Sequence, residues 1–377
     1  MTPDPRADAG QAANDPDGRQ FVVVSGRPGG GIDLEAGGSL AEVTVAYETW
    51  GTLDGAGDNG VLVLHALTAD SHAAGPVGPA HPSPGWWEGL IGPGAPLDTD
   101  RYFVVCPNVL GGCRGTTGPA SVAPDGAPYG SRFPLVTIRD QVSVEAALAD
   151  QLGIERWAGV VGGSMGGMRV LEWCVGFPER VGRALILAVG AAATAEQIAL
   201  CSLQVRAIRS DAAFGGGDYY QAAAGPVEGL ALARGIGQVS YRTRLELERR
   251  FGRDAQAPED PLKGGRFAVE SYLEHHGEKL AQQFDANSYI ILSEAMNHHD
   301  VGRGRGGVAR ALSRVRAETT VAGIDSDRLY PLELQHELAH LLPGDRSVAV
   351  IESLSGHDGF LVETEQVGAV VATAMGA

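Results

Sequence analysis

One serine of the chain stands in a spacing that is typical of a covalent nucleophile. The segment from Gly162 to Gly166 matches G-x-S-x-G, in which the serine occupies a sharp turn between a buried strand and a helix. An apolar run at 157–161 precedes it, and apolar side chains recur at helical spacing over 168–177. The flanking glycines would let the strand and the helix approach closely. The sequence therefore predicts that Ser164 attacks a carbonyl carbon.

A serine hydroxyl needs a base to take its proton and an acid to orient that base. His357 and Asp327 each follow a predicted strand late in the chain. Because parallel strands end at one edge of a sheet, both side chains are expected beside Ser164. Asp325 competes for the acid role, but it suits a turn or a cap, and we favour Asp327 because it reaches further over the sheet edge. The predicted catalytic set is Ser164, Asp327 and His357.

The oxyanion that forms when a serine attacks a carbonyl needs backbone N–H groups as donors. The amide directly after the nucleophile, that of Met165, is the first predicted donor. The second is expected from the loop after the predicted strand 61–65, where we choose Leu67.

Short apolar runs alternate with helical patterns along most of the chain. The main helical patterns span 137–152, 332–342 and 361–375. This alternation predicts an α/β fold with a mostly parallel central sheet and right-handed crossovers. The predicted strands are 21–24, 41–49, 61–65, 102–106, 157–161, 184–189, 319–324 and 348–351.

The alternation stops after Val189 and resumes only at the strand 319–324. The interval holds helical patterns at 193–209 and 242–251, and a structureless loop of that length is improbable in a compact domain. We therefore expect an inserted helical lid. The predicted organisation is a disordered tail at 1–20, a core at 21–190 and 311–377, and the lid at 191–310.

Charge and composition restrict the partners and the compartment. The formal net charge of −17 over 377 residues argues against nucleic acid or an anionic membrane as a partner, since both need a basic face. No stretch is apolar enough to span a membrane, and residues 1–20 lack the apolar core of a signal peptide, so we expect a cytoplasmic protein. The four cysteines form no C-x-x-C pair or metal-ligand spacing, which predicts neither a disulfide framework nor a metal site.

The segment 336–340, His-Glu-Leu-Ala-His, matches the H-E-x-x-H pattern of zinc peptidases and offers a competing chemistry. A hydrolytic zinc site would need a third ligand, for which Glu363 and Glu365 are the candidates. Pro343 ends this helix, and no further histidine follows at the spacing of the longer zinc motifs. We favour a solvated helix face here.

The segment 302–307, Gly-Arg-Gly-Arg-Gly-Gly, could approach a phosphate group. It is neither a P-loop nor a G-x-G-x-x-G turn after a strand. A turn that closes the lid is the favoured interpretation.

Longer motifs give the chain a more specific resemblance. Over nearly all of its length beyond the tail, it resembles the homoserine O-acyltransferase family within the α/β-hydrolase superfamily. The segments that carry this resemblance are His65 to His72, Cys106 to Pro119, Gly162 to Met168, Asn287 to Tyr289, His299-Asp300 and Ser326 to Pro331.

The resemblance implies an α/β-hydrolase fold and the roles already given to Ser164, Asp327 and His357. It also implies substrate contacts by Arg234 and Asp358, since an arginine can pair with the carboxylate of homoserine and an aspartate with its ammonium group. The implied reaction moves an acyl group from acyl-CoA to L-homoserine through an acyl-serine, in methionine biosynthesis. The resemblance further implies a homodimer through the lid and no cofactor, with acyl-CoA as a co-substrate.

The acyl donor and the acceptor stay open to alternatives. Succinyl-CoA or serine could replace acetyl-CoA or homoserine if a few pocket residues differed. A succinyl donor adds a carboxylate that needs its own cation, and no such cation can be assigned from the sequence, so acetyl-CoA is favoured. A carboxylesterase is compatible with the serine motif alone but is disfavoured by the longer motifs.

Overall fold

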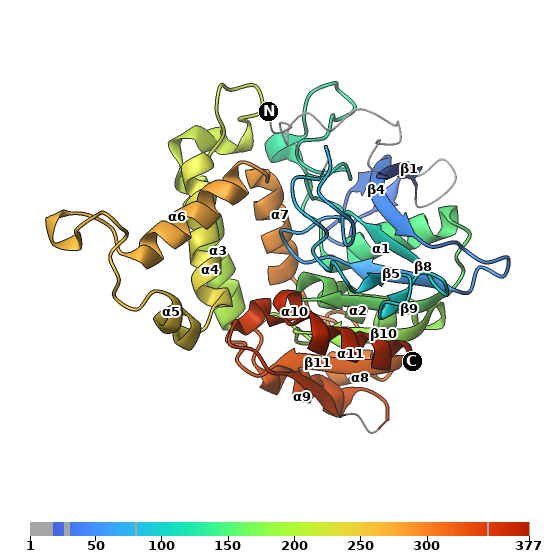
Figure 1. The fold of residues 1–377 in the computed structure, drawn as a ribbon. Coiled ribbons are helices and arrows are strands. Elements are labelled where there is room, and N and C mark those ends of the chain that lie inside the picture. Colours follow the sequence, from blue (N-terminus) through green and yellow to red (C-terminus); the bar gives the residue numbers. More distant parts are fainter. Residues whose placement is uncertain (1–17, 26–30, 80, 345–346, 377) are drawn as a thin grey trace.

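A computed structural model describes residues 18–25, 31–79, 81–344 and 347–376 and places an eight-stranded sheet at the centre of the fold (Figure 1). The strand order is β1-β4-β8-β5-β9-β10-β11-β12. The bounds are β1 Gln20–Val24, β4 Val43–Trp50, β5 Gly60–Leu64, β8 Phe103–Pro107, β9 Trp157–Gly163, β10 Val181–Leu187, β11 Glu318–Ile324 and β12 Val348–Ile351. Two small two-stranded sheets pair β2 Ile32–Asp33 with β3 Ser39–Leu40 and β6 Ile91–Gly92 with β7 Leu97–Asp98.

The sheet is parallel from β8 to β12 and antiparallel at its β1 and β4 edge. Strand β5 is buried at every position, as expected of a central parallel strand covered on both faces. Its side chains alternate between two apolar cores: Leu62 and Leu64 belong to one, and Val61 and Val63 belong to the other. The period-2 pattern of the strand therefore builds both layers at once.

Helices cover both faces of the sheet. The core that contains Leu62 and Leu64 also receives side chains from α1, α2, α8 and α9, whereas α11 packs on the opposite core. The capping box of Thr137 and Asp140 fixes the start of α1. The bounds are α1 Ile138–Gln151, α2 Met165–Gly176, α8 Val308–Leu312, α9 Leu332–Leu341, α10 Gly359–Val362 and α11 Thr364–Met375.

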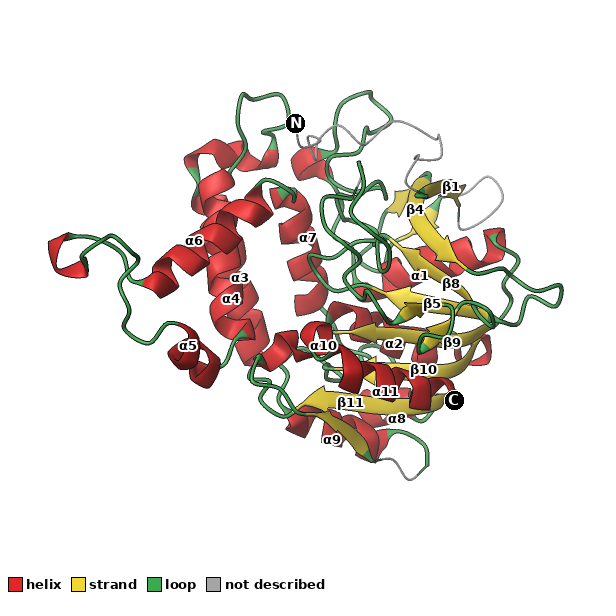
Figure 2. Cartoon of the chain, in the orientation of Figure 1, coloured by secondary structure: helices red, strands yellow, loops and turns green. Residues whose placement is uncertain are grey.

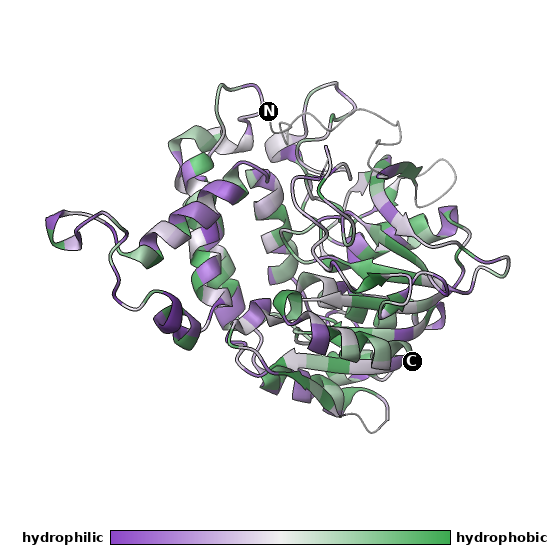
Figure 3. Cartoon of the chain, viewed as in Figure 1, coloured by the Kyte–Doolittle hydropathy of each residue, from purple (hydrophilic) through white to green (hydrophobic). Residues whose placement is uncertain are grey.

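Of the α-helices between β10 and β11, the five from α3 to α7 form a separate layer beside the carboxyl ends of the strands (Figure 2). Contacts join α3 to α4, α4 to α6 and α3 to α7. The bounds are α3 Ala195–Ser210, α4 Val227–Tyr241, α5 Arg244–Arg250, α6 Ala268–Ala281 and α7 Ala286–Asn297. These helices mix hydrophilic and hydrophobic residues, whereas the strands of the sheet are mainly hydrophobic (Figure 3).

The predicted fold class is confirmed, and all eight strands of the central sheet coincide with predicted ones within a few residues. Two boundaries differ. Strand β10 begins at Val181, and the predicted closing helix 361–375 is broken at Glu363 into α10 and α11. Most of the predicted tail, residues 1–17, lies outside the described residues. Among the described residues, no helix is long and apolar enough to cross a membrane.

Candidate active site

Three residues from distant parts of the chain form a continuous hydrogen-bonded row. Ser164 lies between β9 and α2, Asp327 follows β11, and His357 follows β12. The Ser164 Oγ is 2.8 Å from His357 Nε2, and His357 Nδ1 is 2.6 Å from the Asp327 Oδ2. The order and spacing are those of a nucleophile, a base and an orienting acid.

The backbone at Ser164 has the strained geometry of a nucleophile elbow. Its φ is 57° and its ψ is −124°, a combination that a residue with a side chain rarely adopts. A Cβ at Gly166 would collide with the Leu64 carbonyl, and one at Gly162 would lie 2.8 Å from the same oxygen. Both glycines are therefore needed for α2 to begin so close to the end of β5.

The Asp327 carboxylate is held from the side opposite His357. Its Oδ1 accepts hydrogen bonds from the amides of Leu329 at 2.8 Å and Tyr330 at 2.9 Å, which leaves Oδ2 for the imidazole. Asp325, the competing acid, accepts instead from the Ser353 amide at 3.0 Å. Of the two aspartates, Asp327 is the one that the structure brings to His357.

The environment of His357 favours its protonated form. The imidazole is 4% exposed, and burial by itself lowers the pKa. The charge of Asp327, the hydrogen bond to it and the charge of Asp358 outweigh this effect and raise the pKa of His357 above its ordinary value of 6.5. The arrangement therefore stabilises the imidazolium that forms when the base takes the serine proton.

The predicted oxyanion donors, the amides of Leu67 and Met165, follow the carboxyl ends of two neighbouring strands. Met165 is the first residue of α2, and Leu67 follows the carboxyl end of β5, the neighbour of β9 in the sheet. Within the described part of the chain, neither amide donates a hydrogen bond. Unpaired N–H groups are what an oxyanion site requires, and the assignment of Leu67 and Met165 to that role stays a prediction.

The turn that carries Leu67 is held by buried polar contacts. His65 accepts from the Val109 amide through Nε2 at 3.1 Å, so its Nδ1 carries the proton and donates to the Ala66 carbonyl at 2.8 Å. Burial and the charge of Arg169 lower the pKa of His65 to about 3, which keeps this ring neutral. These bonds fix the backbone directly before Leu67.

Arg169 connects this turn to the nucleophile helix. It lies on α2, is fully buried, and donates to the His65 carbonyl. Its Nη1 also donates to Glu145 on α1 at 2.7 Å, and the other oxygen of that carboxylate accepts from Trp173 at 2.8 Å. One buried ion pair therefore links α1, α2 and the predicted oxyanion turn.

Arg234 and Asp358 lie near the triad but make contacts that the sequence does not reveal. The Arg234 guanidinium stacks over the Tyr241 ring at 5.6 Å, and that ring lies 5.9 Å from the His357 ring. Asp358 forms an ion pair with Arg242 at 3.0 Å. Each residue therefore contacts a residue at the end of α4, Arg234 through Tyr241 and Asp358 through Arg242.

Sequence reasoning missed three residues that surround the base. Tyr330 tilts over His357 with ring centroids 5.0 Å apart, Tyr241 approaches from α4, and Arg242 pairs with the residue after the base. Tyr330 stands in the motif that contains Asp327, which could have pointed to it. Nothing in the local pattern distinguishes Tyr241 or Arg242 from other helix-end residues.

The competing motifs do not form sites in the structure. His336, Glu337 and His340 are exposed on α9, and no described residue completes a metal-binding group with them. Glu363, a candidate third ligand, accepts a hydrogen bond from the Ser353 hydroxyl at 2.7 Å.

The arginines of segment 302–307 are paired with carboxylates. Arg303 pairs with Glu35 at 2.7 Å, and Arg305 donates to Glu172 at 2.8 Å. The segment therefore closes a turn on the core instead of presenting free cations to a phosphate.

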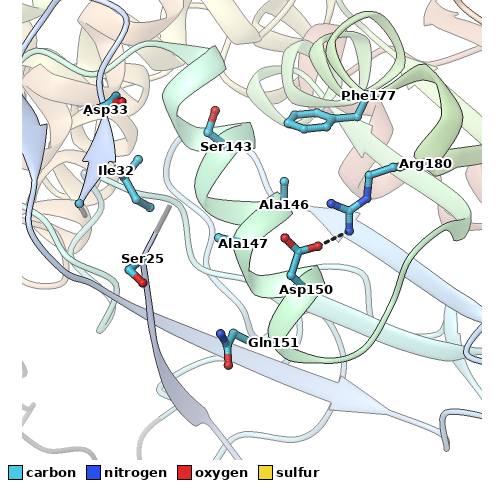
Figure 4. A pocket seen from close by; sticks show the side chains of 11 residues that line it. Ser25, Ile32, Asp33, Ser143, Ala146, Ala147, Asp150, Gln151, Phe177 and Arg180 are labelled. Carbon is cyan, nitrogen blue, oxygen red and sulfur yellow. Dashed lines mark ion pairs between the residues drawn. The ribbon is translucent and has the colours of Figure 1, made fainter. Parts of the chain in front are cut away.

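A hollow of about 510 Å³ lies against α1, away from the triad (Figure 4). Its one arginine, Arg180, pairs with Asp150 at 2.8 Å and donates to the carbonyls of Ile154 and Glu155. The Arg180 cation is therefore already satisfied and is not free to bind an anionic ligand. Its lining includes Ser25, Ile32, Asp33, Ser143, Ala146, Gln151 and Phe177.

Comparison with known proteins gives the same fold and a specific family. Residues 59–364 match the family model described as the alpha/beta hydrolase fold. The homoserine O-acetyltransferase of Thermobifida fusca is 59% identical over 98% of this chain and 97% of its own length. That of Nocardia farcinica is 54% identical over 100% of this chain and 97% of its own length.

Solved structures of other proteins show the same fold. A homoserine O-acetyltransferase from Bacillus anthracis superimposes with a TM-score of 0.86 at 27% identity, covering 95% of this chain and 97% of that one. The esterase E22 superimposes with a TM-score of 0.85 at 27% identity, covering 95% of this chain and 100% of the esterase. The fold alone therefore does not distinguish acyl transfer from ester hydrolysis. The high sequence identity to the acetyltransferases distinguishes the two activities. This chain belongs to the homoserine O-acetyltransferase family of the α/β-hydrolase fold.

Proposed function

We propose that the chain transfers the acetyl group of acetyl-CoA to the hydroxyl of L-homoserine, with Ser164 as the temporary carrier. The observation that carries this proposal is the 2.8 Å contact between Ser164 and His357 in a chain 59% identical to a homoserine O-acetyltransferase. The products are O-acetyl-L-homoserine and CoA, which places the reaction in methionine biosynthesis.

In the first half-reaction, His357 takes the proton of Ser164 while Asp327 steadies the imidazolium. The serine oxygen bonds to the carbonyl carbon of the thioester, and the oxyanion accepts from the Leu67 and Met165 amides. The carbon–sulfur bond then breaks, and the sulfur leaves as CoA with the proton from His357. The acetyl group is now an ester on Ser164.

In the second half-reaction, His357 takes the proton of the homoserine hydroxyl. That oxygen bonds to the acetyl carbon, the bond to Ser164 breaks, and the proton returns to the serine. Both half-reactions use protein groups alone, so we propose that no cofactor takes part and that acetyl-CoA is a co-substrate.

We propose that Arg234 pairs with the homoserine carboxylate and Asp358 with its ammonium group. The support is position: Arg234 stacks on Tyr241, which faces His357, and Asp358 directly follows the base. Asp358 is held by Arg242 before substrate arrives, so an incoming ammonium group would share or replace that partner. A fixed acceptor favours transfer over attack by water.

We propose that 191–310 acts as a lid domain over a core of 21–190 and 311–377, and that two chains pair through the lid in the cytoplasm. Large apolar side chains are exposed on α3 and α4, which supports a partner there. They are Ile198, Leu203, Val227, Leu232 and Val239.

A thiol-release assay tests the proposal. Purified protein is given acetyl-CoA or succinyl-CoA, together with homoserine or serine, and Ser164→Ala serves as the blank. CoA release that depends on homoserine and is fastest with acetyl-CoA supports the proposal. Release that is independent of any amino acid indicates an esterase-like hydrolysis, and preference for succinyl-CoA or serine would replace the proposed donor or acceptor.

A further inference from the structure

A second group of ionisable side chains lies buried outside the triad. Glu48 projects from β4, and His72 and His81 lie on the segment between β5 and β6. All three are buried, with exposures of 5%, 7% and 2%. One ligand-capable atom from each lies within 4.8 Å of the other two. The mechanism uses none of these groups.

The Glu48 carboxylate is oriented by its neighbours. Its Oε1 accepts from the Ser71 hydroxyl at 2.6 Å, and that hydroxyl in turn accepts from Asn108 at 3.1 Å. Its Oε2 is 2.9 Å from His72 Nδ1 and 3.6 Å from His81 Nε2. One oxygen is therefore anchored, and the other is directed between the two imidazoles.

His72 has an oxygen acceptor at each ring nitrogen. Its Nε2 lies 3.2 Å from the Pro76 carbonyl, and a carbonyl can only accept, so Nε2 carries a proton. Its Nδ1 faces the Glu48 carboxylate, so a neutral ring would direct a lone pair at a negative oxygen. A proton or a metal ion on Nδ1 relieves that repulsion. A histidine that binds a metal through one nitrogen usually donates its other N–H to such a carbonyl.

Among the described residues, neither ring nitrogen of His81 has a hydrogen-bond partner, although the side chain is only 3% exposed. Its ring stacks on that of His72, with centroids 3.7 Å apart and an interplanar angle of 7°. In its neutral form the ring offers a lone pair at one nitrogen, and no described residue donates a hydrogen bond to it. An unpaired buried polar group costs about 1–3 kcal/mol, which a ligand would recover.

We propose that Glu48, His72 and His81 form a binding site for a divalent transition-metal ion, with zinc as the metal that suits the ligands best. Two imidazole nitrogens and one carboxylate oxygen are a known zinc ligand set with a fourth position for water. Ligand atoms in a tetrahedral shell lie about 3.4 Å apart, so small side-chain rotations would close the present spacing. The His81 ring breaks no hydrogen bond when it rotates.

Charges of both signs surround the site, so the affinity for a metal ion has to come from the ligands themselves. Glu48 and Asp70 bring negative charge to His81, and Arg19 brings positive charge. Asp70 is itself 3.8 Å from Arg114. The local field is therefore close to neutral, and direct coordination has to hold the ion.

A metal ion here would link the loop that carries His72 and His81 to β4. The same loop carries Leu67, the predicted oxyanion donor, close to its start, so the site would restrain the loop from its far end. Neither the cysteine spacings nor the H-E-x-x-H motif points to this site. Glu48 is separated from both histidines by β5 and has no recognisable spacing to them.

Zinc uptake by the full-length protein tests the proposal without relying on activity. Protein purified without a polyhistidine tag is stripped with a chelator, titrated with zinc ion alone, and analysed for metal content. His81→Phe keeps a stacked, buried ring and loses no hydrogen bond, so its folding should be unaffected. His336→Ala, on the exposed H-E-x-x-H helix, is the matched control.

We expect stoichiometric zinc binding by the unaltered chain and by His336→Ala. Binding should weaken by at least about 100-fold in His81→Phe, and by roughly 10–100-fold in Ser71→Ala, which frees the Glu48 carboxylate. Zinc should also raise the melting temperature of the unaltered chain but not that of His81→Phe. Absence of stoichiometric binding, or unchanged affinity in His81→Phe, would overturn the proposal.

Discussion

Arg242 at the end of α4 forms a 3.0 Å ion pair with Asp358, the residue directly after the base His357. The pair joins the helical layer to the catalytic turn, and both side chains are only 14% exposed. A Cβ at Gly356, which begins that turn, would collide with the Tyr241 carbonyl. The end of α4 therefore packs directly on the turn that positions the base.

Arg242→Gln should move the acid limb of the acylation rate to higher pH. The negative charge of Asp358 raises the pKa of His357, and Arg242 now offsets part of it. Without the guanidinium, we expect a shift of roughly 0.5 pH unit in the rate of CoA release from acetyl-CoA. Arg250→Gln is the control, because Arg250 pairs at 3.0 Å with Glu246, as Arg242 does, but not with Asp358. Identical pH–rate profiles for the two variants would show that Arg242 does not affect the pKa of His357.

Asp327→Asn should lower kcat by roughly 10⁴-fold, because the base loses the carboxylate that holds its tautomer and stabilises the imidazolium. The charge of Asp327 raises the pKa of His357, so the acid limb of the remaining activity should move to lower pH. Asp325→Asn, which removes a carboxylate that does not contact His357, should keep near-normal kcat. A large loss in Asp325→Asn would show that the acid is misassigned.

Arg169→Met should both destabilise the protein and slow acylation. It leaves Glu145 buried without its cation, which costs about 3–5 kcal/mol, and it releases the His65 carbonyl beside the predicted oxyanion turn. Trp173→Phe also removes a hydrogen bond to Glu145 but leaves the turn untouched. We expect kcat to fall with little change in KM only in Arg169→Met, measured alongside urea unfolding. A comparable kcat loss in both variants would make the role of Arg169 purely structural.

The protein should lose stability as the pH falls from 6.5 towards 4, partly through His299. This ring is 4% exposed and bonds to the Gly190 carbonyl at 3.0 Å. Burial lowers its pKa from 6.5 to about 4. The unfolded chain therefore binds a proton in this range that the folded chain does not, which removes about 1.4 kcal/mol per pH unit from the free energy of unfolding. His299→Gln should flatten the pH dependence of urea midpoints, whereas the exposed His340→Gln should not.

The sequence was sufficient for the sheet and the triad because both depend on local patterns. Apolar runs identify the strands, and Ser164, Asp327 and His357 each follow one of them directly. The helices α4, α6 and α7 were not predicted individually, since polar and small residues interrupt their apolar spacing.

Contacts between distant segments could not be predicted. Arg242 reaches Asp358 only because α4 returns to the sheet edge, and Glu48 meets His72 and His81 only because β4 lies beside β8 in the sheet. Neither pairing leaves a spacing in the sequence. Such groups become visible only when the strand order is known.

The central prediction is that Ser164 carries the acetyl group between the two substrates. Intact-mass spectrometry of a rapid chase tests it most directly. Mixing the protein with acetyl-CoA alone should load one acetyl group, which peptide mapping locates on Ser164 and which Ser164→Ala does not acquire. Homoserine should then discharge the adduct far faster than buffer does, and Arg234→Ala should load normally but discharge slowly. Acetyl on another residue, or loss of the adduct at the same rate with and without homoserine, would contradict the account.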